Sequence, residues 1–289
     1  MTDIVDAEMT ETGSLGTTTA APRSRRGRSV DPIPRWLVVI GILVALFFIL
    51  PTLIVVPMSF DGGQTFQFPP KDFSFRQYQD FFTSAVWLKS LGASLLVAVI
   101  SAALATVVGT AAAVGLNNLT GRLSGFVRTL LMLSMVTPAI VLAVAVYIAF
   151  LKWHLVGTLG GYVLAHGAIG VPFVLVSVTT ALSGFDRQLL RASASLGSPP
   201  LRSFFRVTIP LISRGIVTGA IFAFVTSLDE VVVALFLHSA TFQTLPVQMY
   251  NSVTSEIDPT IAAASTMVVV VGTLLVLLPQ LIRGRRARR

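Results

Sequence analysis

Long apolar stretches separated by short polar segments dominate the chain. Each stretch is long enough to cross roughly 30 Å of hydrocarbon as an α-helix that rises about 1.5 Å per residue. The pattern therefore predicts an all-α, polytopic membrane protein with six transmembrane helices. We expect these helices at residues 36–58, 89–116, 126–151, 158–182, 214–237 and 261–282.

Composition agrees with a membrane-embedded chain. Hydrophobic residues make up 54% of the sequence, charged residues make up 12%, and the mean hydropathy is +0.81. These values lie far outside the range of soluble domains. Glycine and alanine crowd the second and fourth predicted spans, which indicates close helix packing. Pro138 and Pro172 fall inside predicted spans, where each either kinks its helix or lines a cavity.

The basic residues are distributed unevenly between the two sides of the membrane. Of the 21 lysines and arginines, 17 lie in the two termini and in the connections after the second and fourth spans. The positive-inside rule therefore predicts that both termini are cytoplasmic. We expect a disordered N-terminal tail at 1–35, a six-helix transmembrane domain at 36–282 and a basic C-terminus at 283–289. The net charge of +8 is explained by this orientation, so we expect no nucleic-acid partner.

A polar segment at 186–213, between the fourth and fifth spans, predicts two short helices. Leu189, Ala192 and Leu196 recur at helical spacing, and Gly197 can take the left-handed conformation that ends a helix. Ser198 and Pro199 are typical of an N-cap followed by proline in the first turn. The two helices should therefore meet at Gly197.

The second short helix carries two adjacent phenylalanines, Phe204 and Phe205. Neighbouring residues project about 100° apart on a helix, so both rings cannot face one surface. One of them is available to dock into a partner protein. The alternative is an interfacial connector, in which the phenylalanines enter lipid and Arg191, Arg202 and Arg206 lie among headgroups.

Asp229 and Glu230 form the one acidic pair inside a predicted span. A carboxylate at the centre of a span costs about 2.5 to 3.5 kcal/mol, which favours a functional role. No lysine or arginine lies deep in a predicted span to neutralise the pair. The partner is then a bound cation, a proton or a residue of another subunit. In a helix that begins near Arg214, Asp229 lies roughly 22 Å along the axis, in the outer half of the membrane.

A stripe of hydroxyl and aromatic residues leads along this helix to the carboxylate. An organic cation gains both from charge pairing and from aromatic faces, so the stripe is suited to an ammonium group. The alternative is that both acids hydrogen-bond a neighbouring helix or lie at the outer interface. The proposed substrate path consists of Phe222, Thr226, Asp229 and Glu230, with Thr218 further inward.

Enzymatic functions receive little support from the sequence. None of the three lysines follows a glycine, so the phosphate-binding GK[ST] motif of an ATPase is absent. The three histidines lack the paired spacing of metal ligands and are interpreted as packing or interface residues. We therefore expect no catalytic residues, no metal and no cofactor bound by this chain.

The polar segment resembles the cytoplasmic EAA loop of permease subunits of bacterial ABC importers. The family spacing places Arg191-Ala192-Ser193, Gly197, Val207 and Ile209-Pro210 at the motif positions. Arg191 stands where the family usually has glutamate, so it cannot make that glutamate's salt bridges, and Ser193 replaces the second alanine. The resemblance implies a type I importer permease fold and a loop that couples to an ATPase. The implied coupling residues are Arg191, Ala192, Ser193, Leu196, Gly197, Phe204, Phe205 and Pro210.

Further segments resemble the PotC-type permeases of spermidine and putrescine transporters. They are LPTLIVVPMSF, FPPKDFSFRQY, SLDEVVV, TLPVQMY and EIDPTIAAAST. The resemblance implies import of polyamines or a similar small organic cation through a bacterial inner membrane. It also implies four partners: two copies of an ATP-binding subunit that uses ATP, a second, PotB-like permease and an extracytoplasmic solute-binding protein.

Two rival functions come from other classes. In a secondary transporter or channel, Asp229 or Glu230 would be a proton or ion site. A membrane-embedded enzyme is the third alternative, and it lacks a paired catalytic constellation.

Overall fold

The computed structural model describes residues 34–63, 68–119, 121–186, 188–256 and 258–286. The described chain is helical, apart from one isolated antiparallel bridge between Asp61 and Phe73. The helices that precede the fifth predicted span are α1 (Arg35–Met58), α2 (Arg76–Thr83), α3 (Ala85–Asn118), α4 (Arg122–Val136), α5 (Ala139–Lys152) and α6 (Leu159–Ser183). The later elements are α7 (Gln188–Ser195), α8 (Pro200–Ser203), the π-helical turn η1 (Phe204–Thr208), α9 (Ile209–Asp229), α10 (Val232–Leu237), α11 (Leu245–Asn251), the π-helical turn η2 (Ser252–Glu256) and α12 (Thr260–Arg286).

The chain divides into two compact units, one ending at Phe48 and the other beginning at Ile49. The described part of the first unit is the first half of α1, an apolar helix that is long enough to cross a membrane. The second unit contains the remaining helices and the candidate sites.

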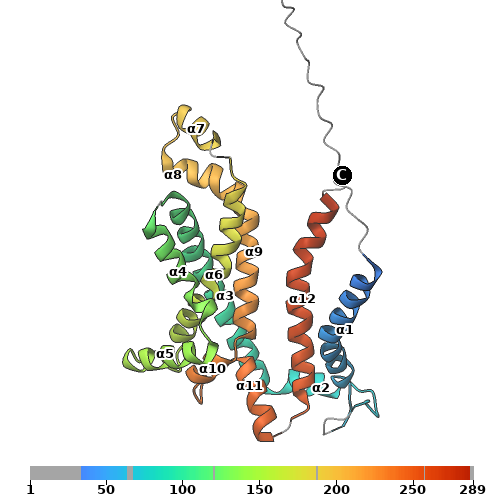
Figure 1. Cartoon of the computed structure of the whole chain (residues 1–289). Helices are drawn as coiled ribbons and strands as arrows, with labels where there is room; N and C mark the ends of the chain where they lie inside the picture. Colours follow the sequence, from blue (N-terminus) through green and yellow to red (C-terminus); the bar gives the residue numbers. More distant parts are fainter. Residues whose placement is uncertain (1–33, 64–67, 120, 187, 257, 287–289) are drawn as a thin grey trace, which may run out of the picture. The chain divides into compact units, whose positions relative to one another are not determined.

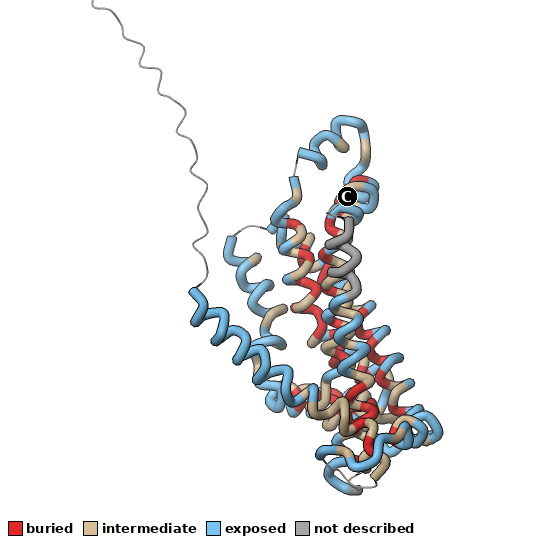
Figure 2. Tube along the Cα trace, turned by 90° about the vertical axis from the view of Figure 1, so that its right-hand side faces the viewer, coloured by how far each residue is buried: buried red, intermediate tan, exposed pale blue. Residues whose placement is uncertain are grey.

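Helices α3, α6 and α9 pack against one another at the centre of the second unit (Figure 1). Small residues allow their backbones to approach closely: a Cβ atom added at Gly109 of α3 would lie 2.7 Å from Cβ of Val174 in α6. Figure 2 shows buried residues along these central helices. This contact confirms the predicted close helix packing. The main buried cluster consists of Ala102, Ala105, Ala113, Val171, Val174, Leu175, Val178, Leu182, Ile212 and Ala223.

Five of the described helices are long and apolar enough to span a membrane, and a sixth span results if the bent pair α4–α5 counts as one. The predicted span at 126–151 is a broken one, because α4 and α5 meet at an angle of 105°. The break lies at Thr137, whose extended backbone precedes Pro138. Proline disfavours helical backbone in the residue before it, and its own nitrogen cannot donate to the helix ladder.

The predicted span at 214–237 is also displaced. The spanning helix runs from Pro200 to Asp229 without interruption, and the chain then breaks before the separate short helix α10. The acidic pair therefore lies at the end of the spanning helix and not inside it. Because Glu230 has extended backbone, it does not continue the helix that carries Asp229.

Candidate functional site

The break after α9 is built around the side chain of Glu230. Its backbone leaves the helical region, with φ −72° and ψ 111°. The carboxylate oxygen Oε1 accepts a hydrogen bond of 2.8 Å from the backbone N–H of Val233, in the first turn of α10. Val231 occupies the N-cap position of α10 and makes no side-chain capping bond, so the Glu230 carboxylate, one residue earlier, satisfies a donor that the helix itself leaves unpaired. Glu230 is thus held by α10.

Asp229 has a different environment from its neighbour. Its side chain is exposed and lines a pocket of about 310 Å³ between α9, α11, η2 and α12. The other lining residues are Leu228, Val231, Pro246, Met249, Tyr250, Val253, Thr254, Ile261 and Val268. A carboxylate beside an aromatic ring, a thioether and aliphatic groups can hold an ammonium group by charge and its carbon chain by apolar contact.

The charge of Asp229 has no counterpart among the described residues. The salt bridge in the described part of the chain joins Arg76 to Asp80, at 3.6 Å, and no lysine or arginine lines the Asp229 pocket. The described residues also contain no group of three histidine, aspartate or glutamate side chains placed to hold a metal ion.

Two predicted companions of Asp229 do not line its pocket. Thr226 and Phe222 lie three and seven residues earlier on α9, and neither lines the Asp229 pocket. Tyr250 and Met249 of α11 lie there instead, and sequence reasoning missed both. The available signal was their place in TLPVQMY, within the stretch 238–259, which has no lysine or arginine.

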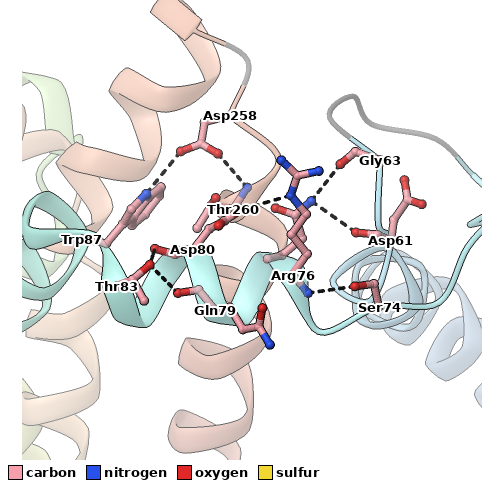
Figure 3. A network of polar contacts seen from close by, with 11 residues as sticks. Asp61, Gly63, Ser74, Arg76, Gln79, Asp80, Thr83, Trp87, Asp258 and Thr260 are labelled. Atoms are coloured by element: carbon pink, nitrogen blue, oxygen red, sulfur yellow. Dashed lines mark hydrogen bonds and ion pairs between the residues drawn. The ribbon is translucent and has the colours of Figure 1, made fainter.

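A polar network joins α3 to η2 and α12, two of the elements that line this pocket (Figure 3). Asp258 accepts a hydrogen bond of 3.2 Å from Nε1 of Trp87 in α3, and its other oxygen accepts from the backbone N–H of Thr260 at 2.9 Å. Its own N–H donates to the carbonyl of Ser252 at 3.2 Å. One carboxylate therefore ties the start of α12 and the turn η2 to α3.

In the segment at 186–213, the first predicted short helix is present as α7, whereas the second is not separate: α8 is the first turn of the helix that continues through η1 and α9 to Asp229. Helix α7 ends at Ser195, and Gly197 takes a left-handed backbone with φ +77° before α8 begins. The predicted N-cap is one residue too early, because Pro199 occupies the N-cap position and Pro200 begins the helix. Ser193 lies 2.8 Å from Ser203, hydroxyl to hydroxyl, so the serine that replaces the family alanine links α7 to α8.

This segment exposes large apolar side chains beside arginines. Leu196 is 87% exposed, Leu201 is 71% exposed and Phe205 is 61% exposed. Phe204 is half-buried instead and lines a pocket of about 490 Å³ behind α7 and α8. The two phenylalanines thus face different surroundings, as predicted. Arg191, Ala192 and Pro210 are exposed as well.

Comparison with known proteins identifies a family and several relatives. Residues 105–289 match the family model described as "Binding-protein-dependent transport system inner membrane component". The spermidine/putrescine transport system permease protein PotC of Haemophilus influenzae is 30% identical over 240 residues, covering 83% of this chain and 93% of the relative. The putrescine transport system permease protein PotI of Escherichia coli K12 is 30% identical over 241 residues, covering 81% and 85%.

A solved structure shares the fold. It is a bacterial alginate ABC transporter in complex with an alginate pentasaccharide-bound periplasmic protein. Its similar chain has a TM-score of 0.64 at 14% identity, with 84% of this chain and 92% of that chain covered. At this identity the likeness concerns the fold and leaves the substrate open.

Proposed function

The chain belongs to the family of binding-protein-dependent transport system inner membrane components, and on this premise we propose that it carries polyamines or a similar small organic cation. It is a multi-pass membrane permease subunit of an ABC importer, not an enzyme. Family membership favours ATP-coupled import over the secondary transporter or channel. Spermidine and putrescine are the first candidates, because two relatives of similar length are permeases for these compounds.

The observation that carries the cation proposal is the Asp229 pocket. Its carboxylate is exposed, lacks a basic partner among the described residues and lies beside Tyr250 and Met249. An ammonium group supplies the missing positive charge, and the methylene chain of a polyamine can contact the aliphatic lining. Thr226 and Phe222 extend the same side of α9 inward, and we place them further along the path. Glu230 belongs to the path as the cap that shapes the break.

The proposed complex contains four further chains. Two copies of an ATP-binding subunit hydrolyse ATP, a second, PotB-like permease completes the pathway, and an extracytoplasmic solute-binding protein delivers the substrate. This chain binds no cofactor of its own in the proposal. The Asp229 carboxylate has no basic partner among the described residues, and this supports the presence of a second permease subunit. A path between two subunits would give the carboxylate further neighbours from the second chain.

The segment at 186–213 is proposed as the coupling element that contacts the ATPase. Leu196 and Phe205 present exposed apolar groups to the partner, while Phe204 packs behind the loop. Arg191, Ala192, Ser193, Gly197 and Pro210 give the loop its shape and charge. Closure of the ATPase dimer would move the attached spans as rigid bodies and reorient the pathway.

Uptake by the assembled complex tests the proposed substrate. Liposomes containing the complex should accumulate labelled putrescine or spermidine only under two conditions. ATP must be present on the side of the membrane where the ATPase lies, and the binding protein must be present on the other side. A neutral sugar and an acidic amino acid serve as matched solutes, and both should fail to compete. Preferential uptake of the anion, or cation uptake that is independent of ATP, would exclude the proposal.

Both termini are proposed to be cytoplasmic, with a tail at 1–35, the permease domain at 36–282 and a basic end at 283–289. The uneven distribution of arginine and lysine favours this orientation in a bacterial inner membrane. A reporter that is active only in the periplasm should therefore stay silent when it is fused after Arg289. The same reporter fused after Gln243, in the proposed outer segment, should be active. The reverse result would show that the membrane orientation is inverted.

A further inference from the structure

The two sides of the break after Asp229 are held by one neighbouring helix. Tyr162 of α6 donates a hydrogen bond of 3.2 Å from its hydroxyl to the backbone carbonyl of Ala234 in α10. One turn later, Nδ1 of His166 lies 2.9 Å from the hydroxyl of Ser227 in α9. A single face of α6 therefore contacts the chain both before and after the acidic pair.

These contacts are deeply buried. Tyr162 is 0% exposed and His166 is 2% exposed, and their rings lie 5.7 Å apart. Just before α6, the backbone N–H of Gly157 donates to the carbonyl of Leu237 at 2.9 Å, at the other end of α10. The loss of such a hydrogen bond is costly in free energy, because the buried polar group that loses its partner has no water molecule to replace it.

Helix α10 depends on these contacts for its position. It has only six residues, and isolated helices of that length do not persist in water. Glu230 caps its first turn, while Tyr162 and Gly157 bind its carbonyls. Since the backbone at Glu230 is extended, α9 does not fix the direction of the chain beyond Asp229. The direction is fixed by α6.

We propose that Tyr162 and His166 are positioning residues that hold Asp229 toward its pocket. His166 holds Ser227, two residues before the carboxylate, and Tyr162 holds α10, which follows the break. Neither side chain lines the Asp229 pocket, so both act through the backbone. The proposal rests on the proposed function for the role of Asp229 in cation transport, and it concerns residues that touch no substrate.

A double-mutant cycle on uptake tests this role. Tyr162→Phe and Ser227→Ala each remove one hydroxyl and change side-chain volume little. In liposomes with equal amounts of assembled complex, each change should raise the KM for putrescine about three- to tenfold, the size expected for one lost buried hydrogen bond. In an Asp229→Asn background, neither change should raise the KM further. Basal ATP hydrolysis should stay within about twofold of wild type.

The matched control is Ser101→Ala. The Ser101 hydroxyl is also buried and donates to a carbonyl of α6, that of Val163 at 3.3 Å, but it does not contact either side of the break. Its removal should leave the KM unchanged. An unchanged KM in both Tyr162→Phe and Ser227→Ala would overturn the proposal. Equal losses in the wild-type and Asp229→Asn backgrounds would do the same, because they indicate a purely structural role.

A second measurement is independent of the substrate. The chain contains no cysteine, so a nitroxide on Asp229→Cys reports on one position of this subunit. Tyr162→Phe and Ser227→Ala should increase the mobility of the label, whereas Ser101→Ala should not. Unchanged mobility would overturn the positioning role even if polyamines are transported. If wild-type complex imports no polyamine while the label responds as expected, the proposed substrate fails and the positioning role stands.

Discussion

Replacing Gly197 with valine is expected to abolish uptake while the complex still assembles and hydrolyses ATP. Gly197 has φ +77° between α7 and α8. A β-branched residue is strongly disfavoured there, with a cost of about 1 to 3 kcal/mol, so the turn should change shape. The exposed Leu196 next to it would then present a different surface to the ATPase. The measurement is uptake per ATP hydrolysed by equal amounts of reconstituted complex.

Asparagine at the same position is the matched control. A Cβ atom at Gly197 would meet no other atom within 4 Å, so the substitution acts through backbone conformation alone. Asparagine tolerates the left-handed region far better than valine does. Gly197→Asn should therefore retain most of the uptake. Normal coupling in Gly197→Val would remove the loop from the coupling mechanism, and equal losses in both variants would indicate that glycine is needed for another reason.

The turn at Gly197 was predictable because its signals are local. The spacing of Leu189, Ala192 and Leu196 marks the first helix, and a glycine after it marks the stop. The hydrogen bond between Ser193 and Ser203 was not predictable, since it depends on the angle at which two helices meet. The shift of the N-cap by one residue has a similar origin: Ser198 and Pro199 both fit a helix start, and the three-dimensional path selects between them.

The number of spans and most of their positions followed from hydropathy, but the displacement of the fifth span and the interruptions did not. Pro138 was a visible signal, yet a proline inside a span is compatible with a small kink as well as with the observed angle of 105°. Nothing in the run from Ser227 to Leu237 marks a break, because its apolar residues suit either one helix or two. The extended backbone at Glu230 depends on tertiary contacts. They are the hydrogen bond from the Val233 N–H to the Glu230 carboxylate and the hydrogen bond from the Tyr162 hydroxyl to α10.

Of the candidate site, the carboxylate could be predicted from the sequence and its neighbours in the pocket could not. An acidic residue in an apolar run is conspicuous, so Asp229 could be identified by itself. Its pocket partner Tyr250 lies 21 residues later in the chain, beyond a turn and on the short helix α11. Periodicity cannot locate contacts of this kind. The bond between Trp87 and Asp258, which joins residues 171 positions apart, was equally inaccessible.

Asp229→Asn is expected to reduce uptake about tenfold or more at limiting putrescine or spermidine. Asparagine preserves the size of the side chain and removes its charge. The lost contact is a charge-assisted hydrogen bond to an ammonium group, worth about 1.5 to 3 kcal/mol, and about 1.4 kcal/mol corresponds to a factor of ten. The loss should appear mainly as a raised KM. The measurement is the initial rate of uptake by liposomes with equal amounts of assembled complex, over a range of substrate concentrations.

Glu230→Gln is the matched control, because it removes a charge from the adjacent residue. The amide oxygen of glutamine can still accept the hydrogen bond from the Val233 N–H, so α10 should keep its cap and uptake should fall much less than in Asp229→Asn. Equal losses in the two variants would mean that net negative charge at the break matters more than the pocket. A wild-type rate for Asp229→Asn at low substrate would remove Asp229 from the path, and the pocket beside Tyr250 would then be a packing feature.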